Sequence, residues 1–317
     1  MHRFATDPDP AVREPAARPA PAGPGALRLV RIAGARVTDR RRLVDDDHNL
    51  EFLTGTVVEY GLPVRTAFFQ EPVNTFSTLA TVALERLEAA GGLGGPVDLA
   101  LLAHAAPDSH VHEVPASFAV GALPGEPFAF TINDQNVTAS FTALSLAHAY
   151  ARRRPTQRVA VFFFDQELQP YPTPTEPHLR VDGDAVVLLV LESDPAEPTA
   201  GPLDVRLLPG VPPGQVQARL GEQISALFPD PGERPRLLLG PGLDPAWPLP
   251  DGAGAAVASV RRVPPGLPST GLWLALAEEL DGRAADGARP HTGPLLLADY
   301  DRTNADLSVC RVGRAAG

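Results

Sequence analysis

Cysteine is almost absent from this chain of 317 residues: Cys310 is the single one, so no disulfide can form within the chain. Basic residues are also few, 27 against 38 acidic ones, and the net charge of −11 argues against nucleic acid or an anionic membrane as a main partner. No apolar run approaches the roughly 18 residues of a membrane span, and no signal-peptide segment is evident. These absences predict a cytoplasmic protein without a membrane partner.

What the chain does contain predicts a globular core. The hydrophobic fraction of 44% is ordinary for a folded protein, and the length allows two domains or one duplicated unit. Residues 1–25 are rich in Pro and Ala without apolar periodicity, which predicts a disordered leader. The folded part is expected to consist of two halves, residues 26–195 and 196–317.

Short apolar runs alternate with segments of helical periodicity, which favours an α/β fold with mostly parallel sheets covered on both faces. In residues 74–94, Asn74 or Thr75 could cap a helix that Gly91 and Gly92 end. The first half is expected to have strands at 26–38, 97–105, 158–168 and 183–193, a short helix at 114–123, and a strand running into a helix at 128–150. The second half repeats this order, with helices at 212–228 and 268–280, a strand at 234–240, and two strands around a turn at 293–313.

Four segments carry a family resemblance: "VDLALLAHAAPDSHVHEVPASFAV", "FTINDQNVTASFTALSLAHAY", "VDGDAVVLLVLES" and the hairpin at 293–313. Their order resembles the thiolase superfamily and, within it, the ketoacyl-ACP synthase III group, over roughly residues 26–314. The resemblance implies a duplicated five-layer α-β-α-β-α fold and a dimer. It also implies that the strand at 158–168 and the segment near 108–120 take part in the dimer interface.

The chain departs from this family at all three catalytic positions. Asn136 stands where the resemblance places the nucleophilic Cys, at the start of a helix where a thiol would be activated. A carboxamide cannot form a thioester. The family His should follow the strand at 234–240, where Gly240 and Pro241 stand, and the segment "VPPGLPSTG" before the late helix lacks the family Asn. The chain thus resembles a degenerate member without the Cys/His/Asn set.

The sequence gives weak support for other residues that could replace the missing Cys/His/Asn set in catalysis. Cys310, in an apolar strand, is expected to be inert core. Ser140 and Thr138 are expected to be helix-face residues because no His is evident nearby to activate them, and His148 to be core or interface. The loop that holds His104, Asp108, His110 and His112 is expected to be solvated rather than a metal site. No metal or other cofactor is expected.

The remaining polar group is "NDQN", which includes Asp134, Gln135 and Asn136. In one interpretation these side chains bond to the helix N-terminus in a site that has lost its chemistry. In the other they hold a polar ligand, or Asp134 acts as a base with a raised pKa. They are the candidate site residues of the chain.

Two classes of function follow from the resemblance. The preferred one is a non-catalytic partner subunit in secondary-metabolite biosynthesis of the polyketide or fatty-acyl type, paired with a Cys-bearing homologue in a heterodimer. The alternative is a stand-alone acyltransferase, or another enzyme that processes acyl-CoA or acyl-carrier-protein thioesters, without a Cys nucleophile. A homodimer is compatible with the second class.

Overall fold

The computed structural model describes residues 27–40, 42–43, 71–110, 113–133, 135–153, 158–172, 176–193, 202–230, 232–247, 257–281 and 293–313, with scattered positions between 51 and 68. The leader expected over residues 1–25, Asp134 and His112 therefore lie outside the described residues. In the described part of the chain, no helix has the length and apolar character that crossing a membrane requires.

The first half of the chain forms one mixed sheet of five strands. Its strands are β1 (Leu27–Val37), β4 (Leu99–His104), β5 (Phe128–Ile132), β6 (Arg158–Asp165) and β7 (Asp184–Ser193). They lie in the order β1-β7-β6-β4-β5. Strands β5, β4 and β6 are parallel, whereas β7 is antiparallel to both β6 and β1.

The second half forms a sheet with the same topology. Its strands are β8 (Leu203–Leu208), β9 (Arg236–Leu239), β10 (Ser259–Arg262), β11 (Leu295–Asp301) and β12 (Asp306–Val312), in the order β10-β9-β11-β12-β8. If the strands of each half are numbered one to five along the chain, their order across the sheet is 3-2-4-5-1 in both halves. A short pairing of β2 (Arg42–Leu43) with β3 (Pro72–Val73) lies apart from both sheets. The duplicated core expected from the sequence is confirmed.

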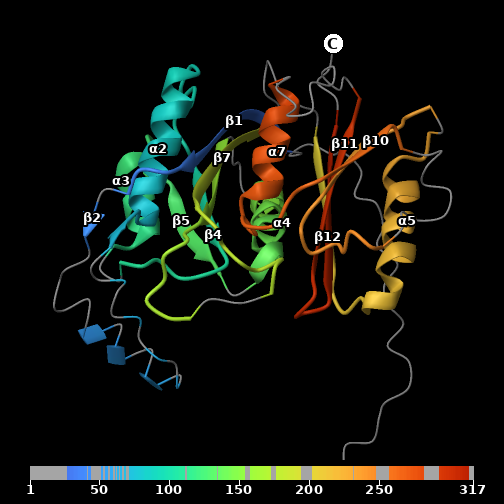
Figure 1. Cartoon of the computed structure of the whole chain (residues 1–317). Helices are drawn as coiled ribbons and strands as arrows, with labels where there is room; N and C mark the ends of the chain where they lie inside the picture. The colour runs from blue at the N-terminus through green and yellow to red at the C-terminus, as the bar shows by residue number, and fades with distance from the viewer. Residues whose placement is uncertain are drawn as a thin grey trace, which may run out of the picture.

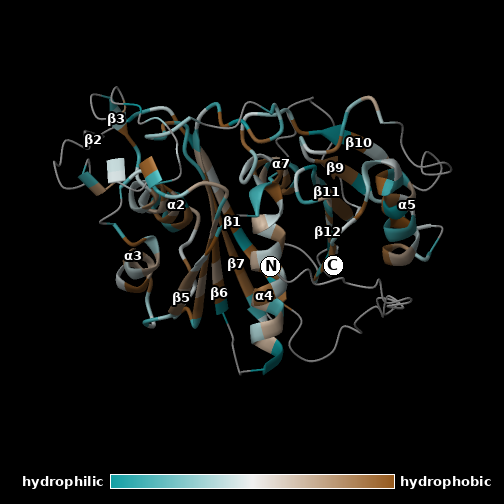
Figure 2. Ribbon diagram, turned by 90° about the horizontal axis from the view of Figure 1, so that it is seen from below, coloured by the Kyte–Doolittle hydropathy of each residue, from teal (hydrophilic) through white to brown (hydrophobic). Residues whose placement is uncertain are grey.

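Layers of helices alternate with the two sheets, which gives five layers in all (Figure 1). The helices are α2 (Phe76–Ala89), α3 (Pro115–Ala122), α4 (Ala139–Arg153), α5 (Val216–Leu227) and α7 (Gly271–Leu280). Helices α2 and α3 pack on the outer face of the first sheet, and α5 packs on the outer face of the second. Helices α4 and α7 lie between the two sheets (Figure 2). Apolar side chains of both halves form one central core there.

Local sequence explains the boundaries of the outer helix α2. The Thr75 side chain accepts a hydrogen bond from the backbone N–H of Thr78 at 3.2 Å and caps the helix start. Gly91 and Gly92 follow the helix with φ values of 105° and 71°, a conformation that side chains other than glycine rarely adopt. The predicted cap and stop are both confirmed.

The expected place of strand β6 at a dimer interface is wrong. This strand lies inside the sheet between β4 and β7, and its Phe run is covered within the chain. Phe164 stacks on Phe76 of α2 with ring centroids 4.8 Å apart, while Phe163 packs on Trp273 of α7 at 4.9 Å. Strand β6 is therefore apolar on both faces because a layer of helices covers each face of the sheet. The edge strands of this sheet are β5 and β1.

Candidate functional site

The start of the central helix α4 is the place where the sequence predicts the site. A short 3-10 turn, η2 (Asn136–Thr138), leads directly into α4. Asn136 has a φ of 43°, in the left-handed region that Asn tolerates better than most residues. The backbone carbonyl of Gln135 accepts hydrogen bonds from the N–H of Thr138 at 2.9 Å and from its hydroxyl at 2.7 Å. This turn is closed by its own hydrogen bonds.

The side chain of Asn136 is bound to the other half of the molecule. Its Nδ2 donates a hydrogen bond to Oδ2 of Asp301, at the end of β11, over 3.0 Å. Asp301 is fully buried and also accepts hydrogen bonds from the backbone N–H of Thr303 and from Nδ2 of Asn304, both at 2.8 Å. The carboxylate is therefore well satisfied, and the amide at the expected nucleophile position takes part in a bond that joins the two halves.

A second carboxylate makes the opposite connection. Asp165, at the end of β6, accepts hydrogen bonds from the backbone N–H groups of Ser269 and Thr270 and from the Thr270 hydroxyl, the last at 2.6 Å. Ser269 and Thr270 immediately precede α7, so Asp165 holds the segment that leads into that helix. Burial raises the pKa of Asp165 to about 6, and these hydrogen bonds oppose the rise.

The two connections are related by the duplication. Strands β6 and β11 are each the fourth strand of their half, and Asp165 and Asp301 are their last residues. Each carboxylate binds at the start of the central helix that belongs to the other half. We call this pair of connections the reciprocal clamp. The sequence analysis considered neither Asp165 nor Asp301, because their partners are 105 and 165 positions away in the chain.

The position at which the resemblance places the catalytic His is closed by a third carboxylate. Asp299 Oδ1 accepts hydrogen bonds from the N–H of Gly242 at 2.9 Å and from the N–H of Tyr300 at 2.8 Å. A Cβ atom on Gly240 would lie 2.1 Å from Oδ2 of Asp299, and one on Gly242 would lie 1.9 Å from the carbonyl oxygen of Tyr300. The loop after β9 therefore has no room for a side chain at either glycine. Burial raises the pKa of Asp299 to about 7.

The other residues considered from the sequence are buried or partly buried. Cys310 is buried in β12, which confirms its expected place in the core, and burial raises the pKa of its thiol well above the ordinary value. Ser140 is buried on α4. His148, also on α4, has a pKa lowered to about 4 by burial and by the charge of Arg152.

The loop after β4 is only partly solvated, which corrects part of the expectation: Ser109 and His110 are buried, Asp108 is half-buried and Pro107 is exposed. Asp108 Oδ2 accepts a hydrogen bond from the N–H of Phe76 at the start of α2, over 3.0 Å, and burial raises its pKa to about 6. Gln166 donates to the Ser109 hydroxyl at 2.5 Å and to the carbonyl of Asn74 at 2.6 Å. This network joins strand ends to the start of α2. Among the described residues, no group of three or more His, Cys, Asp or Glu is placed to hold a metal ion.

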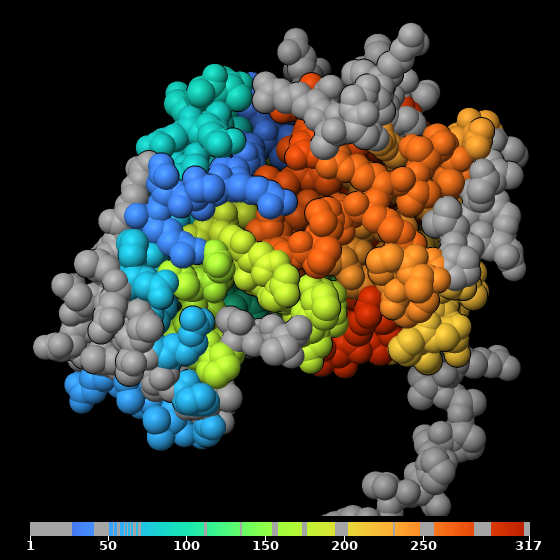
Figure 3. All heavy atoms as spheres, in the orientation of Figure 1, coloured from blue at the N-terminus to red at the C-terminus, as the bar shows by residue number. Residues whose placement is uncertain are grey.

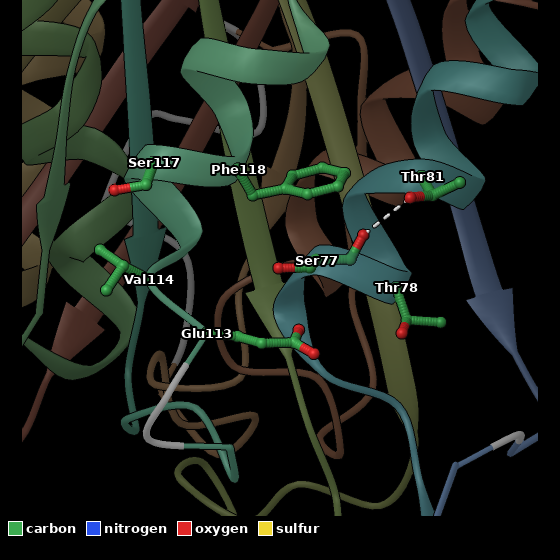
Figure 4. Close-up of a pocket in the computed structure, with 7 residues that line it drawn as sticks. All are labelled: Ser77, Thr78, Thr81, Glu113, Val114, Ser117 and Phe118. Carbon is green, nitrogen blue, oxygen red and sulfur yellow. Dashed lines mark hydrogen bonds between the residues drawn. The ribbon is translucent and has the colours of Figure 1, made fainter.

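A surface groove of about 560 Å³ lies between α2 and the start of α3 (Figure 4). None of its lining residues belongs to the reciprocal clamp. Its lining consists of Ser77, Thr78, Thr81, Glu113, Val114, Ser117 and Phe118. Glu113 is held by the Thr75 hydroxyl, which donates to its Oε2 at 2.8 Å. The lining has hydroxyl groups and a carboxylate but neither Lys nor Arg, so its charge does not favour a phosphate group.

Comparison with known proteins gives a clear result for the fold. No family model matches the sequence, and no curated protein matches it. Among solved structures, ChlB3, described as an acyltransferase, has a TM-score of 0.59 at 17% identity over 91% of this chain and 98% of its own. AbyA1, a tetronic acid condensing enzyme, has a TM-score of 0.56 at 15% identity over 90% of this chain and 99% of its own.

A third similar structure is FabH, the 3-oxoacyl-(acyl carrier protein) synthase III of Pseudomonas aeruginosa PAO1. Its TM-score is 0.56 at 15% identity, over 92% of this chain and 100% of its own. The chain therefore has the thiolase-like fold of the ketoacyl synthase III type along nearly its whole length. At these identities the similarity concerns the fold, and the activity has to be argued from the site.

Proposed function

We propose that this protein is a non-catalytic partner subunit of a condensing-enzyme heterodimer in secondary-metabolite biosynthesis of the polyketide or fatty-acyl type. The observation that carries the proposal is the reciprocal clamp. Asn136 and the N–H groups before α7 are committed to bonds with Asp301 and Asp165. Groups that hold the two halves together in this way are not free to attack a thioester or to stabilise an oxyanion.

The closed loop after β9 supports the same proposal. Gly240 stands where the resemblance places the catalytic His, and the space beside it is filled by Asp299. A site that has lost a single residue could regain function by one substitution. Here a side chain at position 240 would collide with the carboxyl group of Asp299 on the neighbouring strand. A single substitution to His would therefore not restore the catalytic residue.

The alternative function, a stand-alone acyltransferase or acyl-thioester-processing enzyme without a Cys nucleophile, has one observation in its favour. Asp299 has a pKa of about 7, raised by burial, which is the range in which a carboxyl group exchanges protons near neutral pH. Its Oδ1 already accepts two backbone hydrogen bonds, and these are typical of a structural role. We therefore retain the partner subunit as the proposed function.

Strand β5 is the surface that we propose for the partner. It lies at an edge of the first sheet, and no strand of the described residues pairs with its outer side, which favours pairing with another chain there. The Phe128 side chain is 57% exposed and stacks with Tyr150 of α4, with ring centroids 6.1 Å apart. Leu146 of α4 and Val120 of α3 are exposed as well. Exposed apolar side chains beside an open edge favour a protein interface.

Purification from the native host tests the proposal directly. The partner-subunit proposal predicts that a Cys-bearing homologue copurifies with the tagged chain and that only the complex condenses acyl thioesters. Incubation of the isolated chain with acetyl-CoA should leave its intact mass unchanged, since the described residues around Asn136 offer no activated nucleophile.

Two results would overturn the proposal. One is steady turnover of an acyl thioester by the purified chain alone, which would establish the alternative enzyme. The other is an acyl adduct mapped to Ser140 or Thr138, which would identify a substitute nucleophile. Asn136→Cys is the matched variant: it should not restore condensation, because the loop at Gly240 still excludes a His.

A further inference from the structure

The surface groove between α2 and α3 belongs to the outer helix layer of the first half. In Figure 3 the teal atoms of α2 lie exposed on that half, and the orange atoms belong to the second half. The groove measures about 560 Å³, which is within the range of sites that hold a small molecule, roughly 300–1,000 Å³. A molecule can reach it from solvent without separating the two halves.

The carboxylate of Glu113 is held in a fixed position in this groove. Glu113 is the one ionisable residue among the described lining residues. Its Oε2 accepts a hydrogen bond of 2.8 Å from the hydroxyl of Thr75, a fully buried residue that also caps α2 by accepting from the N–H of Thr78. A group that the fold already positions loses less entropy on binding than a mobile one. The groove thus presents a preorganised negative charge.

An aromatic ring and hydroxyl groups share the groove with this carboxylate. Figure 4 shows the Phe118 ring and the Glu113 carboxylate both extending toward Ser77 in the first turn of α2. The face of an aromatic ring attracts cations, and the hydroxyls of Ser77 and Ser117 can each donate or accept a hydrogen bond. Val114, which is 56% exposed, adds apolar surface. The lining therefore suits a ligand with a positive charge, an apolar face and hydroxyl groups.

The helix starts beside the groove carry partial positive charge, which by itself would favour an anion. At α2 a carboxylate already balances this charge, because Asp108 accepts a hydrogen bond from the N–H of Phe76 at 3.0 Å. At α3, which begins at Pro115, Glu113 itself precedes the helix by two residues. Its full negative charge exceeds the charge of one helix start, about half an elementary charge. The balance of charge in the groove therefore favours a cation.

We propose that this groove binds a small organic ammonium ion that carries hydroxyl groups, the chemical class of the amino sugars and amino alcohols. The ammonium group makes a charge-assisted hydrogen bond to Glu113, the apolar face of the ligand packs on Phe118, and its hydroxyls bond with those of Ser77 and Ser117. The inference is independent of the proposed function, because none of these residues belongs to the reciprocal clamp or to the surface proposed for the partner. Binding requires no covalent step.

Three sugars with the same ring test the charge of the ligand. At pH 6.5, glucosamine carries an ammonium group, glucose is neutral and glucuronate carries a carboxylate. Titration of 15N-labelled protein with millimolar glucosamine should shift the backbone N–H resonances of Thr78 and Ser117. Glucose should bind about tenfold more weakly, because it lacks the charge-assisted hydrogen bond, and glucuronate more weakly still. Added salt should weaken the binding of glucosamine but not that of glucose.

Variants show whether glucosamine binds at this carboxylate. Glu113→Gln removes the charge but keeps a side-chain oxygen that can accept from Thr75, so it should lower the affinity for glucosamine about tenfold and abolish the preference over glucose. Phe118→Leu keeps an apolar side chain without the ring and should lower the affinity about threefold. Glu88→Gln, an exposed site near the other end of α2, removes the same charge and should leave binding unchanged. Melting temperatures show whether each variant folds.

Several outcomes would overturn the inference. They are equal affinity for the three sugars, unshifted resonances of Thr78 and Ser117 with glucosamine, and tightest binding of glucuronate, which would instead assign the groove to anions at the start of α3. Equal loss of affinity in Glu113→Gln and Glu88→Gln would overturn it as well, since binding would then follow the net charge of the chain. If Glu113→Gln does not fold, the comparison of the three sugars on the wild-type protein decides by itself.

Discussion

Asn136 meets two requirements at the same position. Its φ of 43° suits a short polar side chain, and its Nδ2 makes the 3.0 Å bond to Asp301. Asn and Asp populate the left-handed region more readily than other residues with a Cβ atom, and an amide can donate to a carboxylate. Asn136 therefore fits the structure as a connecting residue, at the position where the resemblance places the nucleophile.

Two substitutions of Asn136 should separate the contribution of its backbone conformation from that of its hydrogen bond to Asp301. Asn136→Ala loses the hydrogen bond and also places a methyl group at a positive φ, so we expect it to lower the free energy of unfolding by about 2–3 kcal/mol. Asn136→Gly loses only the hydrogen bond and should cost about 1–2 kcal/mol. Urea denaturation measures both. Equal costs for the two variants would show that the backbone conformation contributes nothing.

Gly240 is restricted by space rather than by conformation. Its Cβ would lie 2.1 Å from Oδ2 of Asp299, so Gly240→Ala has to displace a carboxyl group that accepts two backbone hydrogen bonds. We expect a loss of about 1–3 kcal/mol in the free energy of unfolding. Gly214→Ala is the matched control, because no atom lies within 4 Å of a Cβ placed there. A Gly240→Ala protein as stable as that control would contradict the closed loop.

At the scale of elements, the two sheets have unlike edges. Strand β5 is an edge of the first sheet and β8 is an edge of the second, and both expose an apolar side chain, Phe128 at 57% and Leu207 at 40%. They differ in their surroundings: Phe128 stacks with Tyr150 and has the exposed Leu146 and Val120 on the helices beside it. A larger apolar surface favours β5 as the interface.

A charge at each edge tests this difference. Phe128→Arg should abolish the complex with the partner subunit, or a homodimer of the chain, because a desolvated and unpaired guanidinium at an interface centre is strongly unfavourable. Leu207→Arg should leave assembly unchanged. Light scattering at micromolar concentration, with and without the partner, measures both variants. Loss of assembly with Leu207→Arg but not with Phe128→Arg would move the interface to the second sheet.

For the whole molecule, buried carboxyl groups connect stability to pH. Burial raises the pKa of Asp299 to about 7 and those of Asp165 and Asp108 to about 6, from 3.8. A raised pKa means that the folded protein binds more protons than the unfolded chain between pH 4 and 7. The stability contributed by these protonated groups is complete below their unfolded pKa and is lost as the pH rises through 6 to 7.

The lowered pKa of His148, about 4, acts in the opposite direction between pH 8 and 5.5, but one histidine is outweighed by three carboxyl groups. We therefore expect the melting temperature to be higher at pH 5.5 than at pH 8, by at least about 2 °C. Asp299→Asn keeps a carbonyl oxygen for the N–H groups of Gly242 and Tyr300 without the charge, so it should raise the melting temperature at pH 8 and reduce the pH dependence. Asp182→Asn is the control: Arg180 lowers the pKa of Asp182, which stays ionised at both pH values. Calorimetry at the two pH values decides, and a melting temperature that rises toward pH 8 would contradict the prediction.

Across all three scales, the sequence by itself determined the elements with strong local patterns. The cap at Thr75, the stop at Gly91, the buried strands and the repeated order of elements were all predictable, because capping and hydrophobic periodicity act over a few residues. The absence of Cys from the expected nucleophile position was equally visible. Strands β8 and β10 were missed, since they are short and carry polar residues such as Asp204 and Arg261.

Only the tertiary structure decided what the polar residues at the strand ends do. Asp165 binds Thr270, 105 positions later in the chain, and Asp301 binds Asn136, 165 positions earlier. The packing of the two halves determines which helix start each carboxylate contacts. The place of β6 was decided in the same way, because an apolar run covered by helices inside a sheet has the same local pattern as one covered by a partner chain. Such pairings arise from contacts between distant segments, and no local pattern of residues specifies them.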